Sequence, residues 1–204
     1  GDQFGRLAIE LSERQDALQF KTKIHTAFYS LIAHRKARLQ TTVQPLYDAY
    51  TYGRQTGDFE FAALALLNNI AYSIHAGVHL DELEKRCESA LESIVPLKQD
   101  RHETSIRIHA QVVQNLVGLS SNPLVLEGEF IKDTESRPVL IEANDQEALL
   151  ELNGYTCILR FILRDIEGAM EHGPAVEQRR SEEGDIGTYP FEHFYIPLIL
   201  YAAA

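Results

Sequence analysis

The sequence predicts an all-α protein built from antiparallel helical hairpins. Apolar residues recur at spacings of three and four along most of the chain, and glycine or proline separates the periodic stretches. No segment keeps the strict alternation of apolar and polar residues that is typical of a half-buried strand. With 204 residues, of which 45% are hydrophobic and 24% charged, the chain can bury a core without disulfides or metals.

The clearest hairpin lies at residues 44–83. One apolar period runs through 46–53, Gly57 and Asp58 interrupt it, and the same period resumes over 59–75. We expect Asp58 to cap the second helix of this hairpin and Gly77 to end it. Because proline lacks an N–H and suits a first turn, Pro45 favours a start near Gln44 for the first helix.

The other helices follow from the same apolar spacing, which gives about nine helices in total. Their expected ranges are 4–14, 18–34, 80–98, 104–119, 146–163, 165–182 and 191–204.

Turn and capping residues set the expected breaks between the later helices. The helical period lapses over 120–143, where several turn signals predict one long loop between helices. Asn144 is expected to cap the helix that follows, and Gly173 with Pro174 to interrupt the next one. We predict one domain over 1–204. Because the chain begins without Met and ends inside an apolar period, we expect it to be a segment of a longer protein.

Charge and cysteine usage narrow the expected partners. The net charge of −11 argues against nucleic acid or an anionic membrane, since Lys and Arg would be needed to neutralise phosphates. Cys87 and Cys157 lack the paired spacing of a zinc site or of a dense disulfide framework. With no signal peptide and no apolar run long enough to span a bilayer, the sequence predicts a cytoplasmic protein that binds a protein or a small molecule.

No catalytic, cofactor or metal residue is predicted. The chain lacks the glycine-rich phosphate-binding patterns and the G-x-S-x-G nucleophile pattern. His75 and His79 are separated by Gly77, and His102 and His109 lack the His-Glu-x-x-His spacing, so these histidines are expected at helix ends or surfaces. We therefore predict a protein that is not an enzyme. A metal-dependent helical-bundle enzyme that uses His102 and His109 is an alternative.

A weak internal repeat links two parts of the chain. The order acidic, apolar, acidic and alanine in 58–62 returns in 165–169. Ala62 and Ala169 are 107 positions apart (169 − 62), which is near three periods of about 34 residues. This spacing suits a tetratricopeptide-like array, in which hairpins stack as a superhelix and a small alanine lets paired helices approach closely.

Five polar or aromatic residues form the predicted recognition surface. Tyr47, Thr51 and Arg54 lie on the first helix of the clearest hairpin, the helix that lines the concave groove of such an array. Gln111 and Gln114 interrupt the apolar pattern of a later helix, and amides of this kind also satisfy helix ends or loops.

Several residues and short motifs give the chain a resemblance to a known group of proteins. They are Tyr50, Gly57-Asp58, Phe61-Ala62, Gly77 before Leu80, Gln114-Asn115-Leu116 before Pro123, residues 126–130, Phe191, residues 193–195 and Leu198. Over most of 42–203 the chain resembles the tetratricopeptide-like helical region of large hybrid histidine kinases and serine/threonine kinases that carry a predicted ATPase. This resemblance implies that 120–143 is an ordered loop and that ATPase and kinase domains lie elsewhere in the same polypeptide.

The sequence thus leads to one main hypothesis and two alternatives. The main hypothesis is a non-enzymatic regulatory module of a signal-transduction protein, which binds a protein partner or a neighbouring domain of its own chain. A small-molecule effector sensor is the second hypothesis, and the metal-dependent enzyme is the third.

Overall fold

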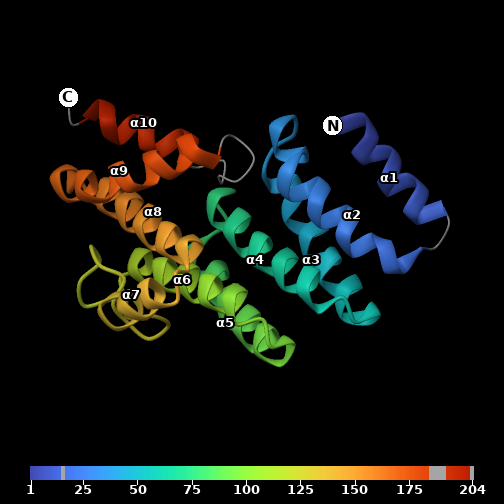
Figure 1. Cartoon of the computed structure of the whole chain (residues 1–204), viewed down its shortest axis with the longest axis horizontal. Helices are drawn as coiled ribbons and strands as arrows, with labels where there is room; N and C mark the ends of the chain where they lie inside the picture. Colours follow the sequence, from blue (N-terminus) through green and yellow to red (C-terminus); the bar gives the residue numbers. More distant parts are fainter. Residues whose placement is uncertain (15–16, 184–191, 203–204) are drawn as a thin grey trace. The chain divides into compact units, whose positions relative to one another are not determined.

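The protein is all-α, as predicted. The computed structural model describes residues 1–14, 17–183 and 192–202, and within these ranges it contains ten α-helices and no strand (Figure 1). The one β-type pairing there is an isolated bridge between Glu127 and Lys132. The additional helix, compared with the nine expected, lies inside the segment that was predicted to be a loop.

The chain divides into two compact units, Gly1–Ile106 and Arg107–Ala204, so the single domain predicted over 1–204 contains both. The helices of the first unit are α1 (Asp2–Arg14), α2 (Leu18–Leu31), η1 (Ala33–Arg35), α3 (Gln40–Thr56), α4 (Phe59–His75), α5 (Leu80–Ile94) and η2 (Val95–Leu97). Helix α6 (Asp100–Val117) begins in this unit and continues into the second.

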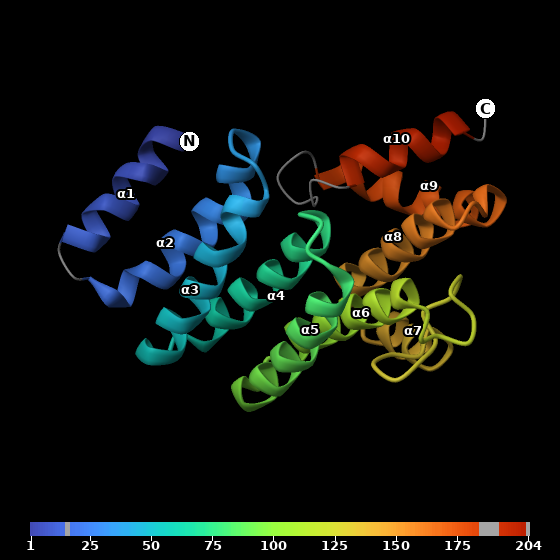
Figure 2. The same ribbon diagram turned by 180° about the vertical axis from the view of Figure 1, so that it is seen from behind.

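Helix α4 is the centre of the first unit. It packs against α2, α3 and α5, and Figures 1 and 2 show α3 and α4 running side by side as a hairpin. Contact on several sides explains why nearly every residue of α4 between Ala62 and Ser73 is buried. A helix that is apolar all round can be stable only when other helices enclose it, and α4 is enclosed in this way.

The turn between α3 and α4 forms as the sequence predicts. Gly57 has φ of +77°, in the left-handed region that favours glycine, and it ends α3. Asp58 lies at the N-cap position of α4, but its side chain makes no capping hydrogen bond and instead stands 3.7 Å from Lys23 Nζ. The predicted capping role of the Asp58 side chain is therefore wrong, because the carboxylate faces a cation on α2.

The crossing of α3 and α4 is very close. A Cβ built on Gly53 would stand 2.7 Å from Ala62 Cβ and 2.9 Å from Thr22 Cγ2. Ala62 is completely buried, which confirms that this alanine lies at the helix crossing. Only small residues on both helices permit backbones to approach this closely.

The start of α3 differs from the prediction. The helix begins at Gln40, so Pro45 lies inside it and removes one helical hydrogen bond. Buried residues hold the first turn in place: Thr42 Oγ1 donates to the Leu39 carbonyl at 2.7 Å, and the Val43 carbonyl accepts from Asn69 Nδ2 at 2.7 Å. Tertiary packing therefore extends the helix toward the N-terminus, so that it begins before the start near Gln44 that Pro45 favours.

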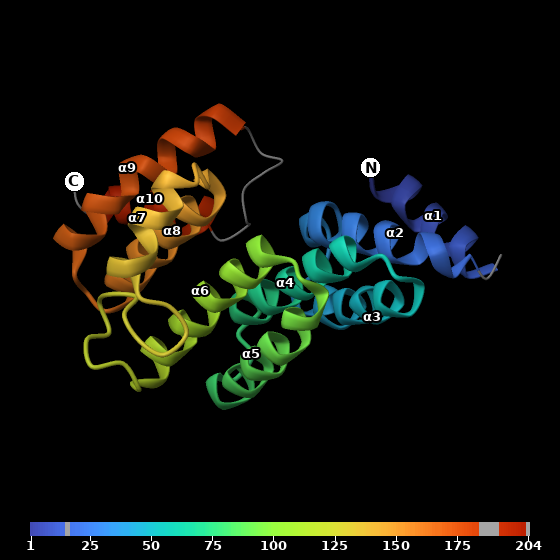
Figure 3. The same ribbon diagram turned by 60° about the horizontal axis from the view of Figure 1, so that its bottom comes forward.

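The second unit contains the rest of α6 with α7 (Asp133–Glu142), α8 (Gln146–Ile162), α9 (Ile166–Glu183) and α10 (Glu192–Ala202). Helix α7 occupies the second half of the predicted 120–143 loop, which leaves an irregular segment at 118–132 (Figure 3). Proline is one of the residues that predicted turns in this segment, but Pro138 lies within α7. The buried Leu140 anchors that helix in a core with residues of α6 and α8.

Two further details of the second unit correct the sequence-based expectations. Asp145, and not Asn144, caps α8, because its carboxylate accepts from the Ala148 N–H at 3.2 Å. Asn144 instead has φ of +52°. Helix α9 continues through Gly173 and Pro174 without interruption.

The 58–62 pattern and its counterpart at 165–169 adopt the same turn. Arg164 has φ of +69°, like Gly57, and the Asp165 N–H returns to the Arg160 carbonyl as the Asp58 N–H returns to that of Gly53. Ala169, like Ala62, is completely buried. The internal repeat therefore corresponds to a repeated helix–turn–helix geometry.

Replacing Ala62 by Leu should destabilise the protein by about 1–3 kcal/mol, since the larger side chain has no room at the α3–α4 crossing. Chemical unfolding with urea measures the effect. Ala27→Leu is the matched control, because Ala27 is exposed on α2. Equal unfolding midpoints for the two variants would contradict the close crossing.

The stability of the first unit should depend on the protonation of His25. This residue of α2 is only 7% exposed, and neither ring nitrogen has a hydrogen-bond partner among the described residues. Its ring lies 5.5 Å from that of Tyr52 and 5.7 Å from that of Tyr29. Burial lowers the pKa of His25 below 6.5, against the opposing effect of Glu13 and Asp48.

Because the pKa of His25 is lowered in the folded state, unfolding takes up a proton as the pH falls below about 6.5. The free energy of unfolding should therefore decrease from about pH 7 to pH 5, relative to His25→Phe, by at most about 1.4 kcal/mol per pH unit. Urea unfolding at several pH values measures this difference. His79→Phe, at an exposed histidine, should keep the wild-type profile. Parallel profiles for wild type and His25→Phe would contradict the prediction.

Candidate functional site

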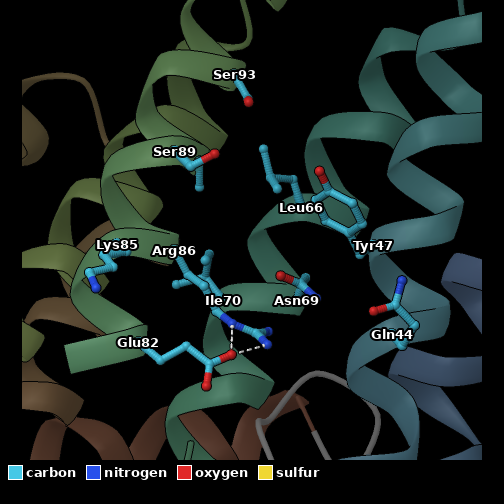
Figure 4. Close-up of a pocket in the computed structure, with 11 residues that line it drawn as sticks. Gln44, Tyr47, Leu66, Asn69, Ile70, Glu82, Lys85, Arg86, Ser89 and Ser93 are labelled. Atoms are coloured by element: carbon cyan, nitrogen blue, oxygen red, sulfur yellow. Dashed lines mark hydrogen bonds and ion pairs between the residues drawn. The ribbon is translucent and has the colours of Figure 1, made fainter. Parts of the chain in front are cut away.

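The candidate site is a pocket in the first unit, where α3 and α5 both flank α4. Its volume is about 330 Å³. The lining residues are Gln44 and Tyr47 of α3, Leu66, Asn69 and Ile70 of α4, and Glu82, Lys85, Arg86, Ser89, Ala90 and Ser93 of α5 (Figure 4). Leu66, Ile70 and Ala90 supply an apolar surface, and the polar side chains surround it.

Asn69 gives the floor of the pocket one oriented hydrogen-bond acceptor. The residue is 3% exposed, and its Nδ2 donates to the Val43 carbonyl on α3 at 2.7 Å. This bond identifies the nitrogen, so the other atom of the amide is the oxygen. Figure 4 shows the oxygen turned toward the pocket and the nitrogen toward α3. The pocket therefore presents an acceptor whose position is set by the packing of α4 on α3.

Arg86 is held in place at the α5 wall. Its Nε and Nη2 donate to Glu82 Oε1 at 3.0 and 2.6 Å, and its Nη1 donates to Ser73 Oγ at 3.3 Å. Ser73 Oγ in turn donates to the backbone carbonyl of Asn69 at 2.7 Å. This chain of hydrogen bonds connects α5 to the buried side of α4.

The rest of the α5 wall offers donors that the fold does not use. Ser89 and Ser93 follow Arg86 at helical spacing and line the same pocket. Lys85 lines the pocket as well and is exposed. It forms no hydrogen bond or ion pair with any residue that the structure describes. The wall can therefore donate hydrogen bonds to carbonyl or carboxylate oxygens of a bound molecule.

Of the three residues predicted on α3, the structure places Tyr47 in the pocket. Its side chain is 47% exposed and stands opposite the α5 wall in Figure 4. Thr51 and Arg54 do not line the pocket. Thr51 Oγ1 donates to the Tyr47 carbonyl at 3.1 Å, and Arg54 lies over the ring of Tyr50 with Nη1 3.2 Å from Tyr50 Oη.

Gln111 and Gln114 belong to the second unit, where both contact the 118–132 segment. Gln111 is completely buried, donates from Nε2 to Asn115 Oδ1 at 2.9 Å and accepts from the Phe130 N–H at 3.2 Å. Gln114 Nε2 donates to Glu129 Oε2 at 3.1 Å on the surface. The predicted recognition role of Gln111 is not compatible with this burial, because its amide serves the loop and is not presented to a partner.

Asn115 is the central residue of this loop anchor. Its Nδ2 donates to the Pro123 and Val125 carbonyls at 3.1 and 2.7 Å. Gly128 packs directly against the Gln111 amide, where a Cβ would collide. These bonds satisfy backbone carbonyls of a segment that has almost no regular secondary structure.

Sequence reasoning did not assign the α4 and α5 parts of the pocket. Asn69 stands out in the sequence as an amide within an apolar helix, but its partner on α3 is distant in the chain. A second signal was available on α5, where Glu82, Arg86, Ser89 and Ser93 repeat at spacings of three and four along a polar stripe beside the apolar one. That signal alone does not tell a solvated face from the wall of a pocket.

The histidines proposed as possible metal ligands are not gathered into a site. His109 is completely buried, with its ring 4.7 Å from that of Tyr155, and His102 is partly buried. In the described ranges, no three His, Cys, Asp or Glu side chains lie close enough together to hold a metal ion.

Comparison with known proteins found no matching family model, curated protein or solved structure. The resemblance to the tetratricopeptide-like regions of kinases therefore stays a prediction. In the part of the chain that the structure describes, no helix combines the length and the apolar character needed to cross a membrane.

Replacing Gln111 by Ala should release the 118–132 segment, because the Phe130 N–H and Asn115 Oδ1 both lose their buried partner. We expect faster hydrogen exchange at the Phe130 amide and a loss of about 1–3 kcal/mol of stability. Gln114→Ala, which removes only a surface bond on the same helix, should leave that exchange rate nearly unchanged. Equal exchange in the two variants would show that Gln111 does not anchor the loop.

Proposed function

We propose that this chain is a non-enzymatic helical module that binds an extended segment of a partner protein in the pocket between α3 and α5. The observation that carries the proposal is the oriented oxygen of Asn69, which faces a pocket whose other polar groups are mostly donors. A peptide backbone offers the complementary set, since each residue supplies one N–H donor and one carbonyl acceptor.

The residues that line the pocket indicate which kind of peptide segment would bind there. The apolar surface of Leu66, Ile70 and Ala90 accepts an aliphatic side chain, and the ring of Tyr47 can cover it. Lys85 favours an acidic residue nearby, because its ammonium has no partner in the described fold. We therefore propose a segment in which an apolar residue is flanked by an acidic one.

The acidic character of the whole chain is consistent with a protein partner. A net charge of −11 disfavours binding of nucleic acid and of anionic lipid headgroups. Within the pocket Glu82 balances Arg86, so the local charge is set mainly by Lys85. A short peptide with a single acidic residue meets this pattern better than a polyanion does.

A small-molecule effector is the second candidate, favoured by the size of the pocket. A volume of about 330 Å³ lies at the lower end of the range, about 300–1,000 Å³, that is usual for ligand pockets. A metabolite that binds there should raise the unfolding temperature of the wild type and not that of Tyr47→Ala.

We place this module in a cytoplasmic signal-transduction protein that carries ATPase and kinase domains. The support is the resemblance carried by Tyr50, Gly57-Asp58 and Phe61-Ala62, together with the repeated turn geometry at 57–62 and 164–169. In that setting the peptide would come from the partner protein or from a neighbouring domain of the same polypeptide. A two-hybrid assay against isolated domains of such kinases tests this placement.

Selection of random peptides displayed on phage against the immobilised protein tests peptide binding. We expect enrichment of one sequence pattern, and binding of a synthetic peptide of that pattern should weaken about tenfold or more in Tyr47→Ala and in Ser89→Arg. The first change removes the aromatic wall, and the second places a large side chain in the pocket.

Phe59→Ala is the matched control for Tyr47→Ala. Phe59 is also an aromatic residue of the first unit, with 46% of its surface exposed, but it does not line the pocket. Its peptide affinity should equal that of the wild type, and circular dichroism should show that all variants fold. Failure to enrich any pattern, or equal affinity of Ser89→Arg and wild type, would reject the peptide site.

A further inference from the structure

A second group of polar side chains gathers in the second unit, where α7 and α9 both adjoin α8. Arg137 of α7 donates from Nη1 to Asn153 Oδ1 on α8 at 3.0 Å, and His172 Nδ1 of α9 lies 3.4 Å from the same oxygen. Arg137 is further held by Asp133, with Nη2 2.9 Å from Oδ2. Residues from three helices therefore meet at one carboxamide.

These contacts determine which atoms are donors. Arginine can only donate, so the Asn153 atom that it meets is the oxygen. His172 Nδ1 must then carry a proton to bond that oxygen, which leaves Nε2 as the second, unprotonated nitrogen of the neutral ring. Asn153 Nδ2 makes no hydrogen bond to any described residue, so it is an available donor beside the histidine.

Arg160 adds a second guanidinium to this group. Its side chain lies against Gly168 of α9, at a place where a Cβ would collide with Nη1, and His172 is one turn further along the same helix face. Nη1 donates to Asp165 Oδ2 at 2.7 Å, while the buried Nε has no hydrogen-bond partner among the described residues. An unmatched buried donor is costly unless another acceptor reaches it.

Burial and the nearby arginines favour the neutral form of the His172 ring. Burial lowers its pKa below 6.5, and the nearby Arg160 and Arg137 lower it further, whereas Glu171 and Asp133 raise it. Asp133 and Asp165 are each already paired with an arginine. The cluster thus combines two guanidinium groups, a free amide donor and a histidine, and two of its neighbouring carboxylates, those of Asp133 and Asp165, are occupied by arginines.

We propose that this cluster of Arg137, Asn153, Arg160 and His172 binds an oxyanion, the carboxylate or phosphate group of a small ligand. The oxyanion would accept from Asn153 Nδ2 and from the guanidinium groups, and it would add a negative charge next to His172. Binding would then be accompanied by proton uptake at His172 Nε2, which changes that atom from an acceptor to a donor toward the anion.

Proton NMR of the His172 ring tests this site in the wild-type protein. The pH titration is recorded in sodium chloride, sodium acetate and sodium phosphate at equal ionic strength. We expect the His172 pKa to be higher by about one unit, a tenfold change in proton affinity, in acetate or phosphate than in chloride. A shift in acetate alone identifies a carboxylate ligand, and a shift in phosphate alone identifies a phosphate ligand.

Arg137→Gln should abolish the difference between the salts. Lys132→Gln is the matched control, because it removes an exposed cation that is paired with Glu135 and does not contact the cluster. Identical titrations of the wild type in all three salts would overturn the proposal without any variant. Loss of the difference in Lys132→Gln would also overturn it, since general charge screening would then account for the effect.

Discussion

The close crossing of two helices after a left-handed turn is the constraint on which the structure depends most. At Gly57 and at Arg164 the backbone takes a positive φ, the chain reverses, and the alanine that follows the turn is buried without any exposed surface. At the α3–α4 turn, a Cβ on Gly53 would stand only 2.7 Å from Ala62 Cβ, so α3 and α4 pack very closely there. Helices α2, α3 and α5 together enclose α4, which makes this apolar helix stable.

The same close packing orients the side chains of the candidate site. Because α3 lies so near α4, the Asn69 amide reaches the Val43 carbonyl, and its oxygen turns to the opposite side. Glu82 and Ser73 hold Arg86 in a similar way. These side chains lose little conformational freedom when a ligand binds, since the fold has already ordered them. The pocket is thus a consequence of how three consecutive helices pack.

The amide side chains of this protein serve two different purposes. Gln111 and Asn115 complete the hydrogen bonds of an irregular backbone segment, so their role ends with the stability of the fold. Asn69 and Asn153 each use only part of their amide within the fold. An amide with one end held and the other end free is suited to binding, whereas one with both ends used is structural.

The sequence by itself determined the all-α class, the turn at Gly57 and the buried position of Ala62, because these depend on local spacing and on residue size. It also indicated Tyr47, which lines the candidate pocket, as a surface residue of α3. Only the tertiary structure decided that α3 begins before Pro45, that Pro138 lies within α7 and that Asp58 faces Lys23. In each case packing against another helix outweighed the local preference of the residue. The partners of Asn69, Gln111 and Asn153 are set by contacts between segments that are distant in the chain, and such contacts leave no local pattern in the sequence.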